Sequence, residues 1–207
     1  MAMKILLFDT ETTDLEGYVV EIAYLVCRLK EDKLRPVRGK AKALNPQAEV
    51  SSYVRWKFHL NPEKFEGLPT FSDFWQESGR EFLNADLIVA HNVSFDLGVL
   101  IRELKRLGKD KDISILKRKP TFCTCKDLLE LTGMWKKPKL EEAVKYFNID
   151  PTQIELTYKN LRERFRFSPK RIRDKSLFYH NALYDTVALA YVFSACYKRF
   201  GKLVLRR

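Results

Sequence analysis

The order of apolar and polar residues along the first half of the chain predicts three strands. Met3 to Phe8 is an apolar run, and it reads as a buried central strand. Val19 to Leu29 and Pro36 to Leu44 are rich in apolar and β-branched residues and lie between turn-forming or charged segments. We expect these two segments to pair with the first strand as an antiparallel meander.

From residue 72 onward, apolar residues recur at the spacing of an α-helix. A helix is predicted from an N-cap at Ser72 to Leu83, followed by a short, fully apolar strand, Leu87 to Ala90. A second helix is predicted from an N-cap at Ser94 to Leu107, and more helices at about 126–131, 140–147 and 181–200. Strands followed by alternating strands and helices predict an α/β sandwich with a mixed sheet.

Length and composition are those of one globular unit. The chain has 207 residues, 45% of them hydrophobic, so we expect a single domain over 1–207, with a basic insertion at about 151–179. The insertion shows weak periodicity, and we interpret it as a helix and a flexible loop near the active face. No apolar run is long enough to span a membrane, and four irregularly spaced cysteines fit reduced thiols. We therefore expect a soluble, cytoplasmic protein.

Charge is distributed unevenly. Residues 1–100 hold 12 Lys and Arg against 15 Asp and Glu, whereas 101–207 hold 26 against 12. Two clusters, 102–119 and 159–175, carry most of the excess, and eight basic residues lie in each. Such asymmetry indicates a polyanionic partner, most simply nucleic acid, although two solvated helix faces would give the same pattern.

Candidate chemistry begins with "FDTETT", residues 8–13. Side chains alternate along a strand, so Asp9 and Glu11 point to the same face, about 6.6 Å apart at roughly 3.3 Å per residue. Oxygen ligands suit Mg²⁺ or Mn²⁺, and a pair of such ions needs three or four carboxylates. Two acids alone are also compatible with an ordinary polar strand end, so further acids should converge from elsewhere.

Two later segments each place a histidine ahead of an aspartate at a predicted helix start. "HNVSFD" (91–96) puts Asp96 in the first turn of one helix, where the helix dipole favours an acid without any function. "HNALYD" (180–185) puts Asp185 in the first turns of the last helix, with His180 at or just before its start.

Together, "FDTETT", "VAHNVSFD" and "HNALYDT" resemble, in order, the three exonuclease motifs of the DnaQ-like 3′–5′ exonucleases of the DEDDh group. The resemblance runs from about Lys4 to Phe200, excluding the insertion. It implies an RNase H-like fold, in which a mixed β-sheet with antiparallel first three strands is flanked by helices.

The resemblance also implies roles for individual residues. Asp9, Glu11, Asp96 and Asp185 would hold two Mg²⁺ or Mn²⁺ ions, and His180 would be the general base. The expected substrate contacts are Thr12, Thr13, Leu15, His91, Asn92 and Phe95, with a hydrogen-bonded structural role as the alternative for His91. Asp14 stands where the family usually has glycine, and we expect a left-handed turn there to survive.

The implied activity is metal-dependent removal of nucleoside 5′-monophosphates from single-stranded or frayed 3′ ends. DNA is slightly favoured over RNA, and a 3′-end-trimming exoribonuclease is the first alternative. A non-catalytic nucleic-acid-binding or polymerase-docking module is the second, and a related endonuclease is a third. The partners implied are DNA or RNA 3′ ends and a polymerase, and no membrane.

Further expectations concern cations and aromatic residues. A set of basic side chains in the insertion is predicted to follow the substrate backbone: Arg162, Arg164, Arg166, Lys170, Arg171 and Arg173. A solvated excursion or a partner-docking arm remains the alternative. Trp56, Trp75 and Trp135 are expected in the core or an interface rather than as base-stacking platforms, and His59 is expected to be structural.

Overall fold

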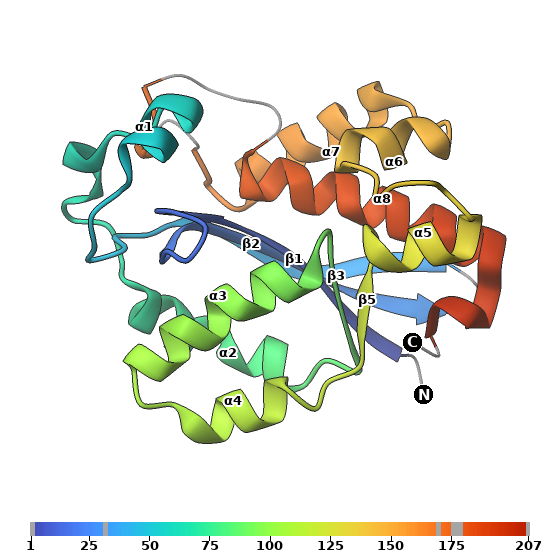
Figure 1. Cartoon of the computed structure of the whole chain (residues 1–207), viewed down its shortest axis with the longest axis horizontal. Coiled ribbons are helices and arrows are strands. Elements are labelled where there is room, and N and C mark those ends of the chain that lie inside the picture. Colours follow the sequence, from blue (N-terminus) through green and yellow to red (C-terminus); the bar gives the residue numbers. More distant parts are fainter. Residues whose placement is uncertain (1–2, 31–32, 169–170, 175–179, 206–207) are drawn as a thin grey trace.

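A five-stranded mixed sheet forms the centre of the computed structural model, which describes residues 3–30, 33–168, 171–174 and 180–205. The strand order is β3-β2-β1-β4-β5 (Figure 1). Three strands form an antiparallel meander: β1 (Met3–Thr12), β2 (Val19–Lys30) and β3 (Lys33–Ala43). Two short strands, β4 (Leu87–Ala90) and β5 (Thr121–Cys123), extend the sheet in parallel to β1. The predicted fold class is confirmed.

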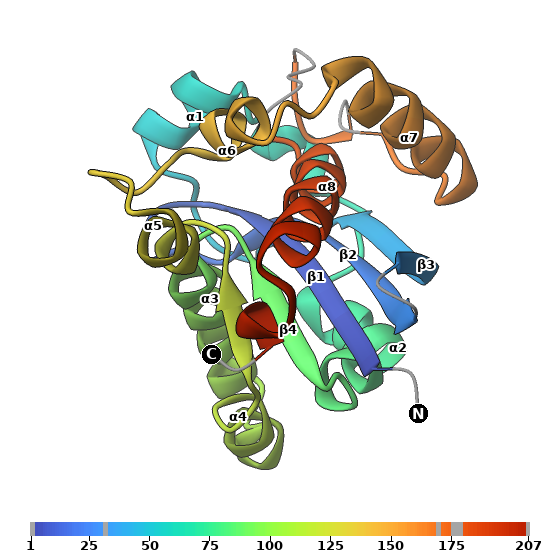
Figure 2. The same cartoon turned by 90° about the vertical axis from the view of Figure 1, so that its right-hand side faces the viewer.

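Helices cover both faces of the sheet (Figures 1 and 2). One face carries α2 (Phe71–Leu83), α3 (Val93–Arg106) and α4 (Asp110–Leu116). The other carries α5 (Lys126–Thr132), α6 (Leu140–Tyr146), α7 (Pro151–Arg164) and α8 (Ala182–Phe200). Short helices α1 (Ser52–Phe58) and η1 (Pro62–Phe65) link β3 to α2, and η3 (Gly201–Leu205) follows α8.

Strand β1 explains why the sheet supports two separate cores. Ile5 and Leu7 belong to the cluster beneath α8, whereas Leu6 and Phe8 belong to the cluster beneath α2 and α3, and all four are fully buried. Asp9 and Glu11 continue the odd-numbered series, so they point toward α8. The strand runs beyond the predicted end at Phe8, because β2 pairs with it as far as Thr12 opposite Val19.

Two predicted helix caps are wrong. Helix α2 is capped by Thr70 rather than Ser72, because Thr70 and Asp73 exchange hydrogen bonds in a capping box. Helix α3 follows Asn92 rather than Ser94; the N-cap Asn92 has a φ of 74° and makes no side-chain capping bond. Both helices therefore begin before the serine that the sequence offers.

The sequence pattern also missed α1, α4 and β5, whose lengths of seven, seven and three residues are too short for a reliable period. The insertion does contain a helix, α7, which packs against α8 through Ile154 and Tyr158. Among the described helices, none combines the length and apolar character that crossing a membrane requires.

Candidate metal-binding active site

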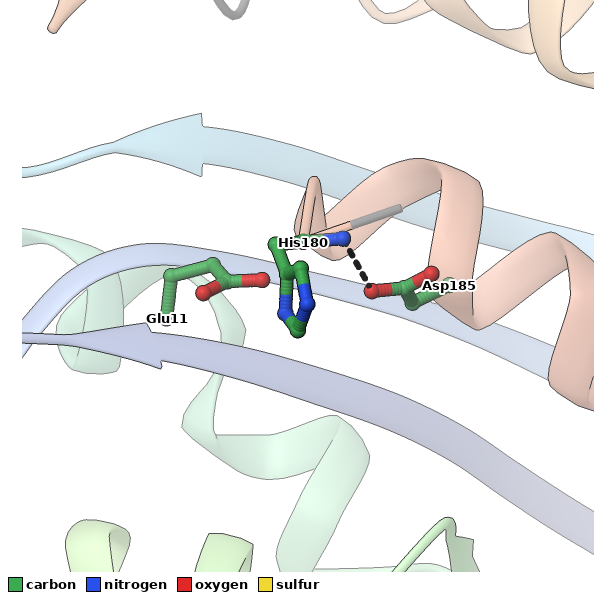
Figure 3. Close-up of side chains that lie close together, drawn as sticks. All are labelled: Glu11, His180 and Asp185. Carbon is green, nitrogen blue, oxygen red and sulfur yellow. Dashed lines mark hydrogen bonds between the residues drawn. The ribbon is translucent and has the colours of Figure 1, made fainter. Parts of the chain in front are cut away.

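Carboxylates from three elements meet at the end of β1. Asp9 and Glu11 come from the strand itself, Asp96 from the first turn of α3, and Asp185 from the first turn of α8. Ligand atoms of Glu11, Asp185 and His180 all lie within 4.8 Å of one another. Figure 3 shows the His180 imidazole between the carboxylates of Glu11 and Asp185. Asp9 and Asp96 lie outside this three-residue group.

The start of α8 orients both His180 and Asp185. The Asn181 side chain caps the helix by accepting a hydrogen bond from the Tyr184 N–H at 3.2 Å. His180 has a φ of 63°, and its backbone N–H donates to Asp185 Oδ2 at 2.9 Å (Figure 3). Asp185 Oδ1 is buried and accepts no hydrogen bond, so this oxygen is available to a cation.

Asp96 is fixed by Thr10 on the neighbouring strand. Its Oδ1 accepts hydrogen bonds from the Thr10 N–H at 3.0 Å and from Thr10 Oγ1 at 2.7 Å. The carboxylate is only 2% exposed. Helix α3 thus delivers Asp96 to the strand that carries Asp9 and Glu11, although 86 positions separate Asp96 from Thr10 in the sequence.

The electrostatics are those of crowded, buried acids. Burial, and then the charges of Asp96 and Asp185, raise the pKa of Asp9 well above its ordinary value. Burial, and then Asp185, do the same to the pKa of Glu11. Burial raises the pKa of Asp96 and of Asp185 to about 7 each, against the opposing hydrogen bonds from Thr10 and from the His180 backbone. Without added positive charge, the folded chain therefore favours partly protonated carboxyls.

These observations fit a divalent cation. Hard ions such as Mg²⁺ and Mn²⁺ take oxygen ligands, and a bound cation offsets the repulsion that raises these pKa values. The unpartnered Asp185 Oδ1 and the 4.8 Å group supply the local donor set. If Asp9 and Asp96 also served as ligands, the site would have the three or four carboxylates that a two-ion centre needs.

His180 has an apolar neighbour, although the residue as a whole is exposed. Its ring packs against Phe58 of α1 at 4.7 Å between centroids. Partial burial of the ring lowers the pKa of His180, and the cations Lys57 and Arg173 lower it further. A lowered pKa keeps the imidazole neutral at physiological pH, which is the form able to accept a proton.

Several predicted substrate contacts are otherwise engaged. The Thr13 N–H already donates to the Tyr18 carbonyl at 2.9 Å, so it is not free for a nucleotide. His91 Nε2 donates to the Pro138 carbonyl at 3.0 Å, which leaves Nδ1 to accept from Thr124 Oγ1 at 2.9 Å. Burial lowers the pKa of His91 to about 4, so it is a neutral structural histidine.

Other predicted contacts remain accessible. The Leu15 side chain is 78% exposed at the tip of the turn after β1, and Asn92 is exposed at the start of α3. Phe95 is half-buried against the α3 core, and Thr12 Oγ1 donates to the Asp14 carbonyl at 2.7 Å. These four residues stay predictions.

The turn after β1 forms without the expected left-handed residue at position 14. Asp14 does not have a positive φ; its Oδ1 instead accepts from the Leu15 N–H at 2.7 Å, and its carbonyl accepts from the Gly17 N–H. A Cβ at Gly17 would lie 2.2 Å from Thr13 Oγ1, so this turn needs glycine at position 17 rather than 14.

The aromatic and structural expectations gave mixed results. Trp75 is buried and donates to Asp112 Oδ2 at 2.8 Å, but Trp56 and Trp135 are 75% and 89% exposed, so a core position is wrong for both. His59 ends α1 with a φ of 52°, and its carbonyl accepts from the Asp174 N–H, which supports the structural role.

The sequence analysis missed one functional candidate, Glu21, and gave another, Arg173, the wrong role. Glu21 lies opposite Glu11 across the β1–β2 pair and is fully buried; a lone acid within the apolar segment Val19 to Leu29 was the available signal. Arg173 was expected on the substrate backbone, but it is 1% exposed and pairs with Glu21, so that prediction is wrong. Arg162, Arg164, Arg166 and Arg171 are exposed, and Lys170 lies outside the described residues.

Comparison with known proteins identifies the family of the chain. The exonuclease family of the RNase T type matches residues 6–193. DNA polymerase III PolC-type of Bacillus subtilis (strain 168) is 26% identical over 190 residues, which are 89% of this chain and 11% of that protein. The chain thus spans about a tenth of that relative's length.

Solved structures show the shared fold. Exonuclease X in complex with 5′ overhanging duplex DNA superposes with a TM-score of 0.63 at 21% identity, over 95% of this chain and 93% of that one. E. coli Exonuclease I in complex with a 5cy-dT13 oligonucleotide superposes with a TM-score of 0.68 at 13% identity, over 99% and 42%. With the family match over residues 6–193, the chain belongs to the exonuclease family of the RNase T type.

Proposed function

We propose that the protein is a metal-dependent 3′–5′ exonuclease that releases nucleoside 5′-monophosphates from single-stranded or frayed 3′ ends. The observation that carries the proposal is the convergence of Glu11, Asp185 and His180 within 4.8 Å, beside two more buried or half-buried acids. In the reaction, a water oxygen forms a bond to the terminal phosphorus while the bond to the 3′ oxygen of the preceding nucleotide breaks.

In this proposal, Asp9, Glu11, Asp96 and Asp185 hold two Mg²⁺ or Mn²⁺ ions. Such ions, when bound, favour ionisation of the attacking water and stabilise the leaving oxygen. His180 accepts the proton of that water; its lowered pKa and its position beside Glu11 and Asp185 support this role. General-base catalysis of this kind contributes typically about 10²- to 10⁴-fold.

The substrate strand would reach the site between the turn after β1 and helix α1. Leu15 is exposed at one side, where it can press against the terminal base. Helix α1 offers exposed Trp56, Arg55 and Lys57, and its Phe58 packs on His180. Aromatic faces stack on bases and cations attract phosphates, so this helix suits a single strand.

DNA is the favoured substrate, because the Exonuclease X and Exonuclease I structures hold an overhanging DNA duplex and a dT13 oligonucleotide. A 3′-end-trimming exoribonuclease is the alternative. The similarity to a PolC-type polymerase supports a polymerase partner as a further proposal. All four cysteines are free and buried, which fits the reducing cytoplasm.

The test is digestion of matched 5′-labelled single-stranded DNA and RNA with Mg²⁺, Mn²⁺ or EDTA. We expect metal-dependent laddering from the 3′ end that is strongly weakened by His180→Ala and unchanged by Glu163→Gln, which alters an exposed acid of α7. Absence of laddering on both strands would refute the catalytic proposal. In that case, retained strand binding by the wild type and by Asp9→Asn would favour the binding-module alternative, and cutting of a circular strand would favour an endonuclease.

A further inference from the structure

Arg173 is a buried arginine inside a basic segment, in which the nearby Arg171 is exposed. Its side chain is 1% exposed, and it forms an ion pair with Glu21, which is fully buried. Taking two charges out of water is costly, and apolar residues of similar volume often serve folding as well or better. The pair therefore calls for an explanation other than stability.

The contacts of the guanidinium lead to the catalytic centre. One amino group binds Glu21, which lies opposite Glu11 in the β1–β2 register. The other, Nη2, donates to the carbonyl of His180 at 2.9 Å. One planar side chain thus connects the strand behind the carboxylates to the residue proposed as general base.

The His180 backbone is consequently held from both sides. Its carbonyl accepts from Arg173, and its N–H donates to Asp185 Oδ2. This residue has the left-handed φ of 63°, which is uncommon for a residue other than glycine. Fixing both peptide groups of a residue in this conformation sets the direction in which its imidazole leaves the chain.

The segment that carries Arg173 is itself anchored. Arg173 bridges Leu60 as an isolated antiparallel pair, the Asn61 N–H donates to the Ile172 carbonyl, and the Asp174 N–H donates to the His59 carbonyl. Lys64 Nζ donates to the Arg173 carbonyl at 2.8 Å and pairs with Asp174 at 2.9 Å. The chain after α1 therefore supports Arg173 from behind.

We propose that Arg173 is a positioning residue, which orients His180 and spaces it from Glu11 and Asp185 without touching the substrate. This inference rests on the proposed function. It assigns the end of the insertion to the catalytic centre rather than to the substrate backbone. Loss of Arg173 should lower kcat and leave KM for the strand nearly unchanged, whereas loss of a phosphate contact would raise KM.

The experiment compares Arg173→Lys, the apolar pair Glu21→Leu with Arg173→Met, and the control Lys159→Met, which alters an exposed cation of α7. The apolar pair leaves no unpaired buried charge and so preserves folding, which circular dichroism checks. A lysine keeps the charge but cannot serve both acceptors with two parallel donors. For both Arg173 variants we expect kcat to fall about 10- to 100-fold, the cost of a small misplacement of a reacting group.

A second readout is the imidazole Cε1–H signal of His180 in the NMR spectrum. It should shift in both Arg173 variants, while the His91 signal stays in place and Lys159→Met alters neither. A folded apolar-pair variant with wild-type kcat, an increase in KM alone, or an unmoved His180 signal would overturn the inference. If the wild type cleaves no strand, the proposed function fails, and the NMR signals still decide whether Arg173 orients His180.

Discussion

Replacing Asp185 by asparagine should stabilise the metal-free protein above neutral pH while abolishing its response to Mg²⁺. The carboxyl is 8% exposed, and burial raises its pKa from 3.8 to about 7. At about 1.36 kcal/mol for each pKa unit, ionising Asp185 at pH 8 costs the folded state up to about 4 kcal/mol. Asparagine keeps an oxygen that can accept from the His180 N–H, so the start of α8 should survive.

The expected gain is smaller than that limit. An amide in place of Asp185 Oδ1 introduces an N–H₂ group where the structure has no partner, which offsets part of the benefit. We expect about 2 kcal/mol at pH 8, which for a chain of 207 residues corresponds to a Tm rise of about 4–8 °C. At pH 5 the folded carboxyl is mostly protonated but the unfolded one is ionised, so a cost of up to about 1.6 kcal/mol remains for the wild type. The unpartnered amide of the variant offsets this remainder, so the two proteins should be about equally stable at pH 5.

The sign of the pH dependence follows from proton linkage. The folded state, with raised pKa values at Asp9, Glu11, Asp96 and Asp185, binds more protons than the unfolded chain. The free energy of unfolding of the metal-free wild type should therefore fall as the pH rises from about 4 through 7. Bound Mg²⁺ should restore it, by about 2.7 kcal/mol at a hundredfold excess over Kd.

The assay is thermal unfolding in EDTA and in Mg²⁺ at pH 5 and pH 8, with Glu163→Gln as the surface control. The reasoning is refuted if Asp185→Asn is no more stable than the wild type in EDTA at pH 8. It is also refuted if Mg²⁺ raises the Tm of the variant as much as that of the wild type.

Three further predictions concern the rest of the site. Thr10→Val removes the 2.7 Å bond to Asp96 but keeps the backbone bond, so urea unfolding should show a loss of about 1.5–3 kcal/mol and the cleavage rate should fall, while Thr10→Ser stays close to wild type. Trp56→Ala should raise KM for a single strand at unchanged kcat, whereas Leu156→Ala, at an exposed apolar residue of α7, should leave both constants unchanged. Apparent Mg²⁺ affinity should weaken as the pH falls from 8 to 6, because protons compete with the ion for carboxyls with raised pKa values. Isothermal titration calorimetry at several pH values measures this affinity, and an affinity that does not change with pH would contradict the prediction.

Much of the fold was accessible from local pattern. The period of two along β1 predicted that Asp9 and Glu11 share a face, and the short apolar strand Leu87–Ala90 was predicted with its observed bounds. Helix α8 was predicted to within a residue, because its apolar pattern is long and the capping Asn181 precedes it. Helix starts failed where a neighbouring residue formed the better cap, as Thr70 did for α2.

The candidate acids were likewise readable, because each lies at a strand end or helix start that the sequence marks. Their grouping was expected only from the family resemblance and not from local pattern, because the contacts that build the site are distant in sequence. Thr10 and Asp96 meet across 86 positions, and Arg173 and Glu21 across 152. In the sequence, Arg173 is one of eight basic residues in the cluster 159–175. Only its ion pair with Glu21 in the structure distinguishes it from the others.

The sequence by itself thus determined which residues could carry the chemistry, since side-chain type and local spacing are properties of the chain alone. The tertiary structure decided which of them are buried, paired or free. It made His91 a structural histidine with both ring nitrogens engaged and brought Arg173 to the carbonyl of His180. The physical reason is that burial and long-range partners set the charge and direction of a side chain, and both depend on elements distant in sequence.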